Sequence, residues 1–282
     1  MSYETLNQLP AALIEGLEGR TLVPYLGPGL LALCDSAPPA DPVALAAKLT
    51  AKVSVPGKIR NRLTAAAQFI ENFKHRQTLV KAMNEAFAVQ AVPSPLHHWL
   101  AQLRSPLIVD AWYDDTLRSA LVAASSRVDW AEVQGLAQSE HFGHWLGWYD
   151  AAGVAQADPI FAPTVFYKPW GGHAPAGNYL VSDSDFVEVL TEIDIQSPIP
   201  LPVQQRRGKL GFVFLGCRFN DQLPRAFARQ IMKRSAGPHY AVLPEPPTRM
   251  EGRFLAEQGI TRIALPLTEV AELLTGALAP AA

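Results

Sequence analysis

The stretch Thr21–Leu30, TLVPYLGPGL, decides the fold prediction, because an apolar, β-rich run passes directly into a glycine turn. Near-continuous apolarity, rather than strict alternation, is what a strand covered on both faces requires. Helical patterns separate such runs, and this alternation predicts an α/β fold with a doubly wound sheet of six parallel strands. The five further runs are Pro106–Asp110, Thr164–Tyr167, Leu210–Leu215, Tyr240–Leu243 and Ile260–Leu265.

Three stretches have the apolar spacing of helices, namely Thr64–Phe87, Asp221–Ser235 and Leu267–Leu278. Residues 32–104 and 125–162 are longer than single crossovers between strands need. We expect both to form a small inserted helical lobe over one edge of the sheet. The prediction is therefore one domain over residues 1–282.

Composition excludes several classes of protein. The chain has 282 residues and a formal net charge of −2, which argues against nucleic-acid binding by bulk charge. Its 49% hydrophobic content is enough for a large core. Two cysteines, Cys34 and Cys217, supply neither a disulfide framework nor a four-cysteine zinc module. Without a secretory signal or a membrane-spanning run, we expect a cytoplasmic protein.

The turn after the first strand is the first candidate binding segment. It consists of Gly27, Pro28, Gly29 and Leu30. Glycines there let backbone amides approach a pyrophosphate, and a following helix points its N-terminal amides at that charge. The turn lacks the third glycine of the usual dinucleotide motif, so an ordinary tight turn is the alternative reading.

Polar residues also follow the later strands. Asp114 or Asp115 is placed to cap the helix predicted at 116–124. Asp221 is likewise placed to cap the helix predicted at 221–235. The third strand leads into Tyr167–His173, and a further polar segment is Ser182–Phe186.

These segments, in this order, resemble the sirtuin-like NAD-binding family, particularly its bacterial branch without a zinc module. The resemblance implies a Rossmann-like fold, NAD bound across the carboxyl ends of the strands, and cleavage of its nicotinamide–ribose bond. It implies pyrophosphate contacts for Gly27 and Gly29, and a supporting role for Asp114 under the catalytic loop. Residues implied on the adenosine and ribose side are Gly216, Cys217 and Arg218.

The chain departs from the family at both catalytic positions. Trp112 stands where the family has its catalytic asparagine, and Trp170 where it has its catalytic histidine. An indole donates a hydrogen bond but cannot accept a proton, so it cannot act as a general base. We expect the two rings to meet over the cleft, at the ~4.5–7 Å typical of aromatic pairs, and to plug it. Leu30 and Leu31 narrow the phosphate turn further.

Two function hypotheses follow. One is a degenerate, non-catalytic or very weakly active protein that serves as an NAD- or ADP-ribose-binding module or as an interaction module. The other is an NAD glycohydrolase with an unusual base, for which His173 in a glycine-rich loop is the candidate. A zinc-dependent protein deacetylase is not expected.

Two further features have plain alternatives. His141 and His144 have the spacing of half a metal site, but the sequence places no third ligand nearby. Residues 206–234 hold eight basic side chains and the single acid Asp221. This basic stripe is either a solvated face or a surface for an acidic protein partner or for phosphates. Nucleic acid is not favoured, since no aromatic residues interleave with the charges.

Overall fold

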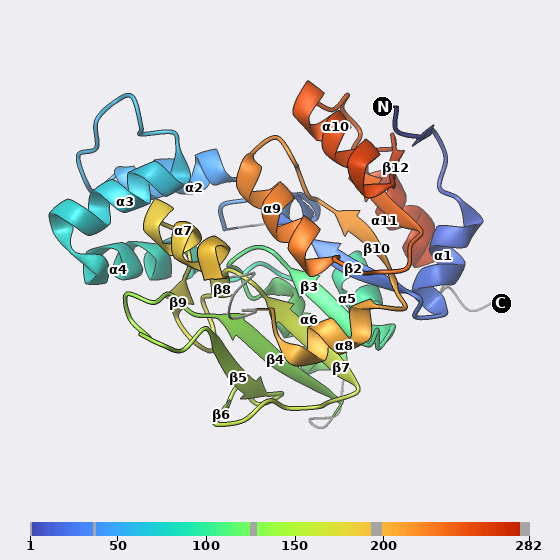
Figure 1. Ribbon diagram of the computed structural model, residues 1–282, viewed down its shortest axis with the longest axis horizontal. Coiled ribbons are helices and arrows are strands. Elements are labelled where there is room, and N and C mark those ends of the chain that lie inside the picture. The colour runs from blue at the N-terminus through green and yellow to red at the C-terminus, as the bar shows by residue number, and fades with distance from the viewer. Residues whose placement is uncertain (1, 36–37, 125–128, 193–198, 277–282) are drawn as a thin grey trace.

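A large, mostly parallel sheet forms the centre of the molecule (Figure 1). The computed structural model describes residues 2–35, 38–124, 129–192 and 199–276. Within them the main sheet has ten strands, in the order β1, β12, β11, β10, β2, β3, β7, β4, β5, β6. In that order their bounds are Thr5–Leu6, Ile260–Ile263, His239–Val242, Gly211–Leu215, Leu22–Leu26, Leu107–Asp110, Thr164–Lys168, Trp130–Gly135, Leu146–Asp150 and Ala155–Gln156. A second sheet pairs β8 (Gly171–Gly172) with β9 (Asn178–Tyr179).

All six segments predicted as strands are strands, and they pair in parallel. Numbered along the chain, they lie in the order 3-2-1-4-5-6, with β2 as the first and β10 as the fourth. The strand order therefore reverses between β2 and β10, and such a reversal point is where doubly wound sheets bind ligands. The predicted number of six strands is too small, because strands are added at both edges.

Helices were predicted over residues 125–162. Residues 125–128 lie outside the described residues, and for residues 129–162 the prediction is wrong. This segment extends the sheet instead: β4 runs parallel to β7, and β5 and β6 follow as antiparallel strands. Every residue of β4 is buried, and the strand lies inside the sheet between β7 and β5. Sheet pairing along the edge of β7 outweighs any local helical preference.

Helices fill most of residues 32–104, and α2 to α4 stand beside the sheet (Figure 1). The stretch Thr64–Phe87 is two helices rather than one. The break is at His75, whose φ of +70° no helix accommodates. The elements here are η1 (Pro28–Leu33), α2 (Pro42–Thr50), α3 (Leu63–Lys74), α4 (Arg76–Phe87) and α5 (Pro95–Gln102).

Helices cover both faces of the sheet. Alternate residues of β2 enter two different cores, with Val23 and Tyr25 in one and Leu22 and Leu26 in the other. The first core packs against α2, α3, α4, α7 (Asp183–Glu192), α8 (Leu201–Arg207), α9 (Gln222–Ile231) and α10 (Arg249–Gln258). The second packs against α1 (Ala11–Glu18), α5, α6 (Thr116–Ala124) and α11 (Leu267–Gly276).

Two predicted helix ends differ from the structure. The helix predicted to Ser235 ends at Ile231, and the last two residues predicted for the final helix lie outside the described residues. None of the described helices is long and apolar enough to cross a membrane.

Candidate functional site

The reversal point between β2 and β10 is closed by its own backbone. The amide of Gly29 donates to the carbonyl of Gly216 at 2.9 Å, and the amide of Gly27 donates to the carbonyl of Leu215 at 2.9 Å. The amide of Leu30 bonds within the turn, to Gly27 O at 3.1 Å. The amides of Gly27, Gly29 and Leu30 are therefore already used, and Pro28 has no amide hydrogen to offer a pyrophosphate.

The glycines of this region allow two loops to touch. A Cβ on Gly216, whose φ is +66°, would lie 2.3 Å from the amide nitrogen of Leu30. A Cβ on Gly29 would lie 2.8 Å from the carbonyl oxygen of Gly216, and one on Gly27 would lie 2.6 Å from the same oxygen. The absence of side chains at these three positions serves loop-to-loop packing.

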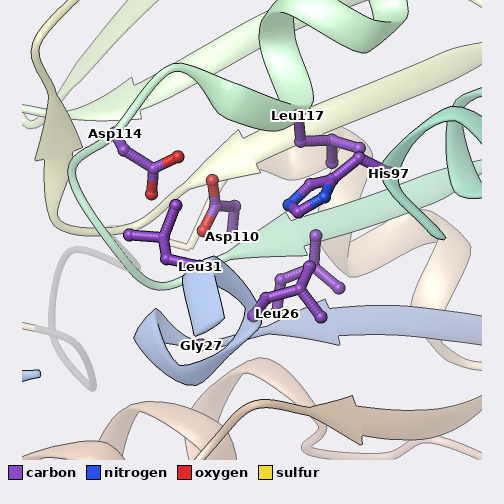
Figure 2. A pocket seen from close by; sticks show the side chains of 8 residues that line it. Leu26, Gly27, Leu31, His97, Asp110, Asp114 and Leu117 are labelled. Atoms are coloured by element: carbon purple, nitrogen blue, oxygen red, sulfur yellow. The ribbon is translucent and has the colours of Figure 1, made fainter. Parts of the chain in front are cut away.

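A small cavity remains beside this contact (Figure 2). Its volume is about 10 Å³, and its polar lining is His97, Asp110 and Asp114. Leucines enclose the rest, with Leu30 and Leu31 both buried. About 10–15 Å³ holds one water molecule, whereas small-molecule pockets measure roughly 300–1,000 Å³. The residues at this crevice therefore do not fit a dinucleotide in the conformation observed.

Trp112 and Trp170 converge as the sequence predicts. Their ring centroids are 6.5 Å apart, and the side chains are buried, with 1% and 8% exposure. Tyr113 packs against both rings, at 5.0 and 6.2 Å. Trp170 also contacts Phe186 of α7 and Phe227 of α9, at 5.7 and 5.9 Å. The two tryptophans belong to an aromatic cluster that joins β3, α7 and α9.

The two indole N–H groups have different surroundings. Trp112 Nε1 donates to the carbonyl of Pro39 at 2.8 Å, which ties the segment before α2 to the end of β3. Trp170 Nε1 is buried without a hydrogen-bond partner among the described residues.

Asp114 has the capping role expected of an acid at a helix start. Its Oδ1 accepts from the amide of Thr116 at 2.9 Å, at the beginning of α6. Its carbonyl accepts from Lys168 Nζ at 2.7 Å. Lys168 also donates to Asp110 Oδ2 at 2.9 Å, and its side chain has no exposure at all.

This buried ion pair was not predicted from the sequence. Burial raises the pKa of Asp110 to about 7, against the opposing effect of Lys168. For Lys168 burial lowers the pKa, but Asp110 and Asp114 outweigh it, so the net pKa lies above the ordinary value. A single lysine closing the apolar run TVFYK is the one sequence signal that points to a buried partner.

Glu132 on β4 extends the same polar region. It is fully buried and accepts from Arg118 Nε at 3.0 Å and from Gln134 Nε2 at 2.5 Å. Burial raises its pKa to about 7, and the contacts with Gln134 and Arg118 oppose that rise.

His173 forms a pair with Asp115. Its Nδ1 lies 2.8 Å from Asp115 Oδ2, and its side chain is 25% exposed. The hydrogen bond that His173 donates to the carboxylate of Asp115 raises the pKa of His173, against the opposing effect of burial. Asp115 is held in turn by the amide of Ala174 at 3.1 Å. A histidine oriented by a carboxylate and open to solvent has the geometry of an acid–base pair.

Cys217 is directed into the protein interior, whereas Arg218 lies along the protein surface. Cys217 is buried, its Sγ lies 3.6 Å from the carbonyl of Tyr25, and burial raises its pKa. Arg218 donates to both carboxylate oxygens of Glu251 in α10, at 3.0 and 3.2 Å, and also contacts Glu245. Its guanidinium is therefore engaged by carboxylates.

Several side chains of the basic stripe have intramolecular partners. Arg207 donates to carbonyls at the end of α9, and Arg225 to the carbonyl of Phe219. Arg229 contacts Glu257 at 3.4 Å. Partner binding by this stripe stays a prediction. His141 and His144 are not part of any group of three or more metal-ligating side chains within the described ranges.

Comparisons with known proteins give one family. The model described as "SIR2-like domain" matches residues 106–263, more than half of the chain. A solved structure reported under "Structural Basis for the Mechanism and Regulation of Sir2 Enzymes" is 14% identical, with 94% of each chain covered and a TM-score of 0.40. No curated protein matches the chain.

Proposed function

The chain belongs to the SIR2-like family, and we propose that it is a degenerate member of the zinc-free branch that acts as a non-catalytic interaction module. Membership of this family suggests a function that is related to NAD. In this proposal the NAD crevice has become part of the protein core, and neither NAD nor ADP-ribose binds there.

The observation that carries the proposal is the backbone contact between Gly29 and Gly216. A pyrophosphate bound at a strand end needs free amides and space for backbone approach. Here the amide of Gly29 is bonded to the opposite loop at 2.9 Å. Opening the crevice would break that bond and expose Leu30 and Leu31, so binding would carry the cost of rearrangement.

The aromatic cluster supports the same conclusion. By the resemblance of their segments to the family's motifs, Trp112 and Trp170 stand where the family has its catalytic asparagine and histidine. Neither indole can accept a proton from a ribose hydroxyl. Each ring is packed on several others, and removing a buried tryptophan side chain typically costs about 3–5 kcal/mol. Displacing these rings would make nucleotide binding unfavourable by a comparable amount.

Titration calorimetry with NAD and with ADP-ribose tests the proposal. We expect no binding to the wild type at 1 mM ligand, and measurable binding to the double variant Trp112→Asn/Trp170→His, in which both rings are removed. Trp130→His is the matched control, because Trp130 is buried in the core on the opposite face of the sheet. Micromolar affinity of the wild type for NAD would contradict a closed crevice.

A second candidate function is NAD glycohydrolysis with His173 as the base. The observation that favours it is the 2.8 Å contact between His173 and Asp115. Turnover of NAD at high enzyme concentration, lost in His173→Ala and reduced in Asp115→Asn, would establish this alternative and overturn the non-catalytic proposal. His141→Ala replaces an exposed histidine and serves as the control. We expect no turnover by any of these proteins.

A further inference from the structure

A second and much larger cavity lies on the outer side of α10, remote in sequence from the closed crevice. Its volume is about 530 Å³, within the roughly 300–1,000 Å³ of small-molecule pockets. The floor is a face of α10 and the wall is the N-terminal segment before β1, two elements that lie side by side in Figure 1. Its lining includes Tyr3, Thr248, Arg249, Gly252, Arg253 and Glu257.

The floor of this groove has unbalanced positive charge. Arg249, Arg253 and Glu257 are spaced four residues apart, so they share one face of α10. Arg253 Nε donates to Glu257 Oε1 at 2.6 Å. Glu257 Oε2 also forms an ion pair with the guanidinium of Arg229, at 3.4 Å. Arg249 is exposed and has no hydrogen bond or ion pair within the described part of the chain. Like charges four residues apart repel, so an anion between the two guanidinium groups would stabilise this face.

The wall of the groove offers an aromatic ring. A Cβ on Gly252 would lie 2.9 Å from Cε1 of Tyr3, so glycine at this position lets the ring lie on the helix. The segment is fixed because the amide of Arg262 donates to the carbonyl of Glu4 at 2.9 Å. The half-buried Tyr3 ring therefore borders the groove on a segment that the sheet holds in place.

Side chains, rather than the end of the helix, supply the recognition. Thr248 Oγ1 accepts from the amide of Glu251, and Glu251 Oε2 accepts from the amide of Thr248, so the helix start is already capped. A guanidinium presents donors in a fork that matches phosphate oxygens, and an aromatic ring stacks on planar rings.

We propose that this groove binds a small phosphate monoester that carries a planar ring, of the class of a nucleoside monophosphate. Arg249 and Arg253 bind the phosphate, and the ring of the ligand stacks on Tyr3. The site is independent of the closed crevice and of the proposed function, and no bond is made or broken in it.

Calorimetric titration of the full chain with AMP tests this site, with adenosine and inorganic phosphate as separate arms. We expect AMP to bind with a Kd below about 1 mM, and more tightly than either fragment. Arg249→Gln should weaken AMP binding about tenfold, the loss of one charge-assisted hydrogen bond. Tyr3→Leu keeps an apolar contact with Gly252 and should weaken AMP binding about fivefold or more through lost stacking.

The control variant is Arg62→Gln, which removes an exposed arginine at the start of α3, across the molecule from α10 in Figure 1, and should leave AMP binding unchanged. No binding of AMP at 5 mM, equal binding of AMP and phosphate, or AMP binding unchanged in Arg249→Gln would each overturn the proposal. NAD carries its adenylate phosphate in a pyrophosphate linkage rather than as a monoester, so we expect no NAD binding in the groove, and the NAD titration of the crevice is repeated in the Arg249→Gln background to separate the two sites. NAD binding that survives in that background belongs to the crevice and contradicts the proposed function alone.

Discussion

At the residue scale, Gly216 combines a left-handed backbone with a close backbone neighbour. We predict that Gly216→Ala lowers the free energy of unfolding by about 2–5 kcal/mol, from backbone strain of about 1–2 and overpacking of about 1–3 kcal/mol. Gly259→Ala is the control, because Gly259 has a φ of +62° and open space around its Cβ position. Urea unfolding of both variants measures the difference. Equal losses would mean that contact with the Leu30 amide contributes nothing.

Gly216 also illustrates how far the sequence could predict the site. A glycine required for a ligand and a glycine required for backbone packing look alike, because both simply lack a Cβ. The meeting of Trp112 and Trp170 was predictable, since both directly follow strands that pair in parallel. The contact of Lys168 with Asp110 was not, because its stability depends on burial among strands distant in sequence.

At the element scale, continuous apolar runs predicted the central strands, and β4 shows where that signal fails. Its sequence WAEVQG places Glu132 and Gln134 between apolar residues, as in a half-exposed strand. Both are fully buried, because they bond each other and Arg118 supplies a further donor to Glu132. The helical spacing of apolar residues continues from α3 through His75 into α4. The break between the two helices therefore could not be recognised from the periodicity of the sequence.

Also at this scale, Arg76 connects the start of α4 to three other elements. Its guanidinium contacts Asp185 of α7 at 2.9 Å, Glu140 of the β4–β5 loop at 3.2 Å and the carbonyl of Tyr179 in β9 at 2.5 Å. Arg76→Ala leaves the buried carboxylate of Asp185 without this cation, so we predict a loss of about 3–5 kcal/mol in urea unfolding. Lys74→Ala, at an exposed position two residues earlier at the end of α3, should change stability by less than about 0.5 kcal/mol. A loss below 1 kcal/mol for Arg76→Ala would show that α4 is held by apolar packing alone.

At the scale of the whole molecule, buried carboxyl groups make stability depend on pH. Burial raises the pKa of both Asp110 and Glu132 to about 7. A carboxyl group with a higher pKa in the folded state binds its proton more tightly there, so its stabilising contribution is full at low pH and is lost as pH rises through 7. We predict that the free energy of unfolding contributed by Glu132 falls by a few kcal/mol between pH 5 and 8, at about 1.4 kcal/mol per unit of pKa shift.

Thermal unfolding at pH 5, 6, 7 and 8 measures this dependence. Glu132→Gln should flatten the fall of the melting temperature with pH, since the amide does not titrate. Glu18→Gln, at an exposed position, should retain the slope of the wild type. An unchanged slope in Glu132→Gln would mean that Glu132 is ionised throughout this range, as an ion pair with Arg118.

The two outermost strands of the main sheet, β1 and β6, are each two residues long. A sheet grows into aggregates by adding strands from other molecules to unpaired backbone groups at its edges. The outermost strand at each edge offers such a template over only two residues. Within three residues after β6 come Asp158, a charged residue, and Pro159, which has no amide N–H. Growth of this sheet into intermolecular β-structure is therefore disfavoured at both of its edges.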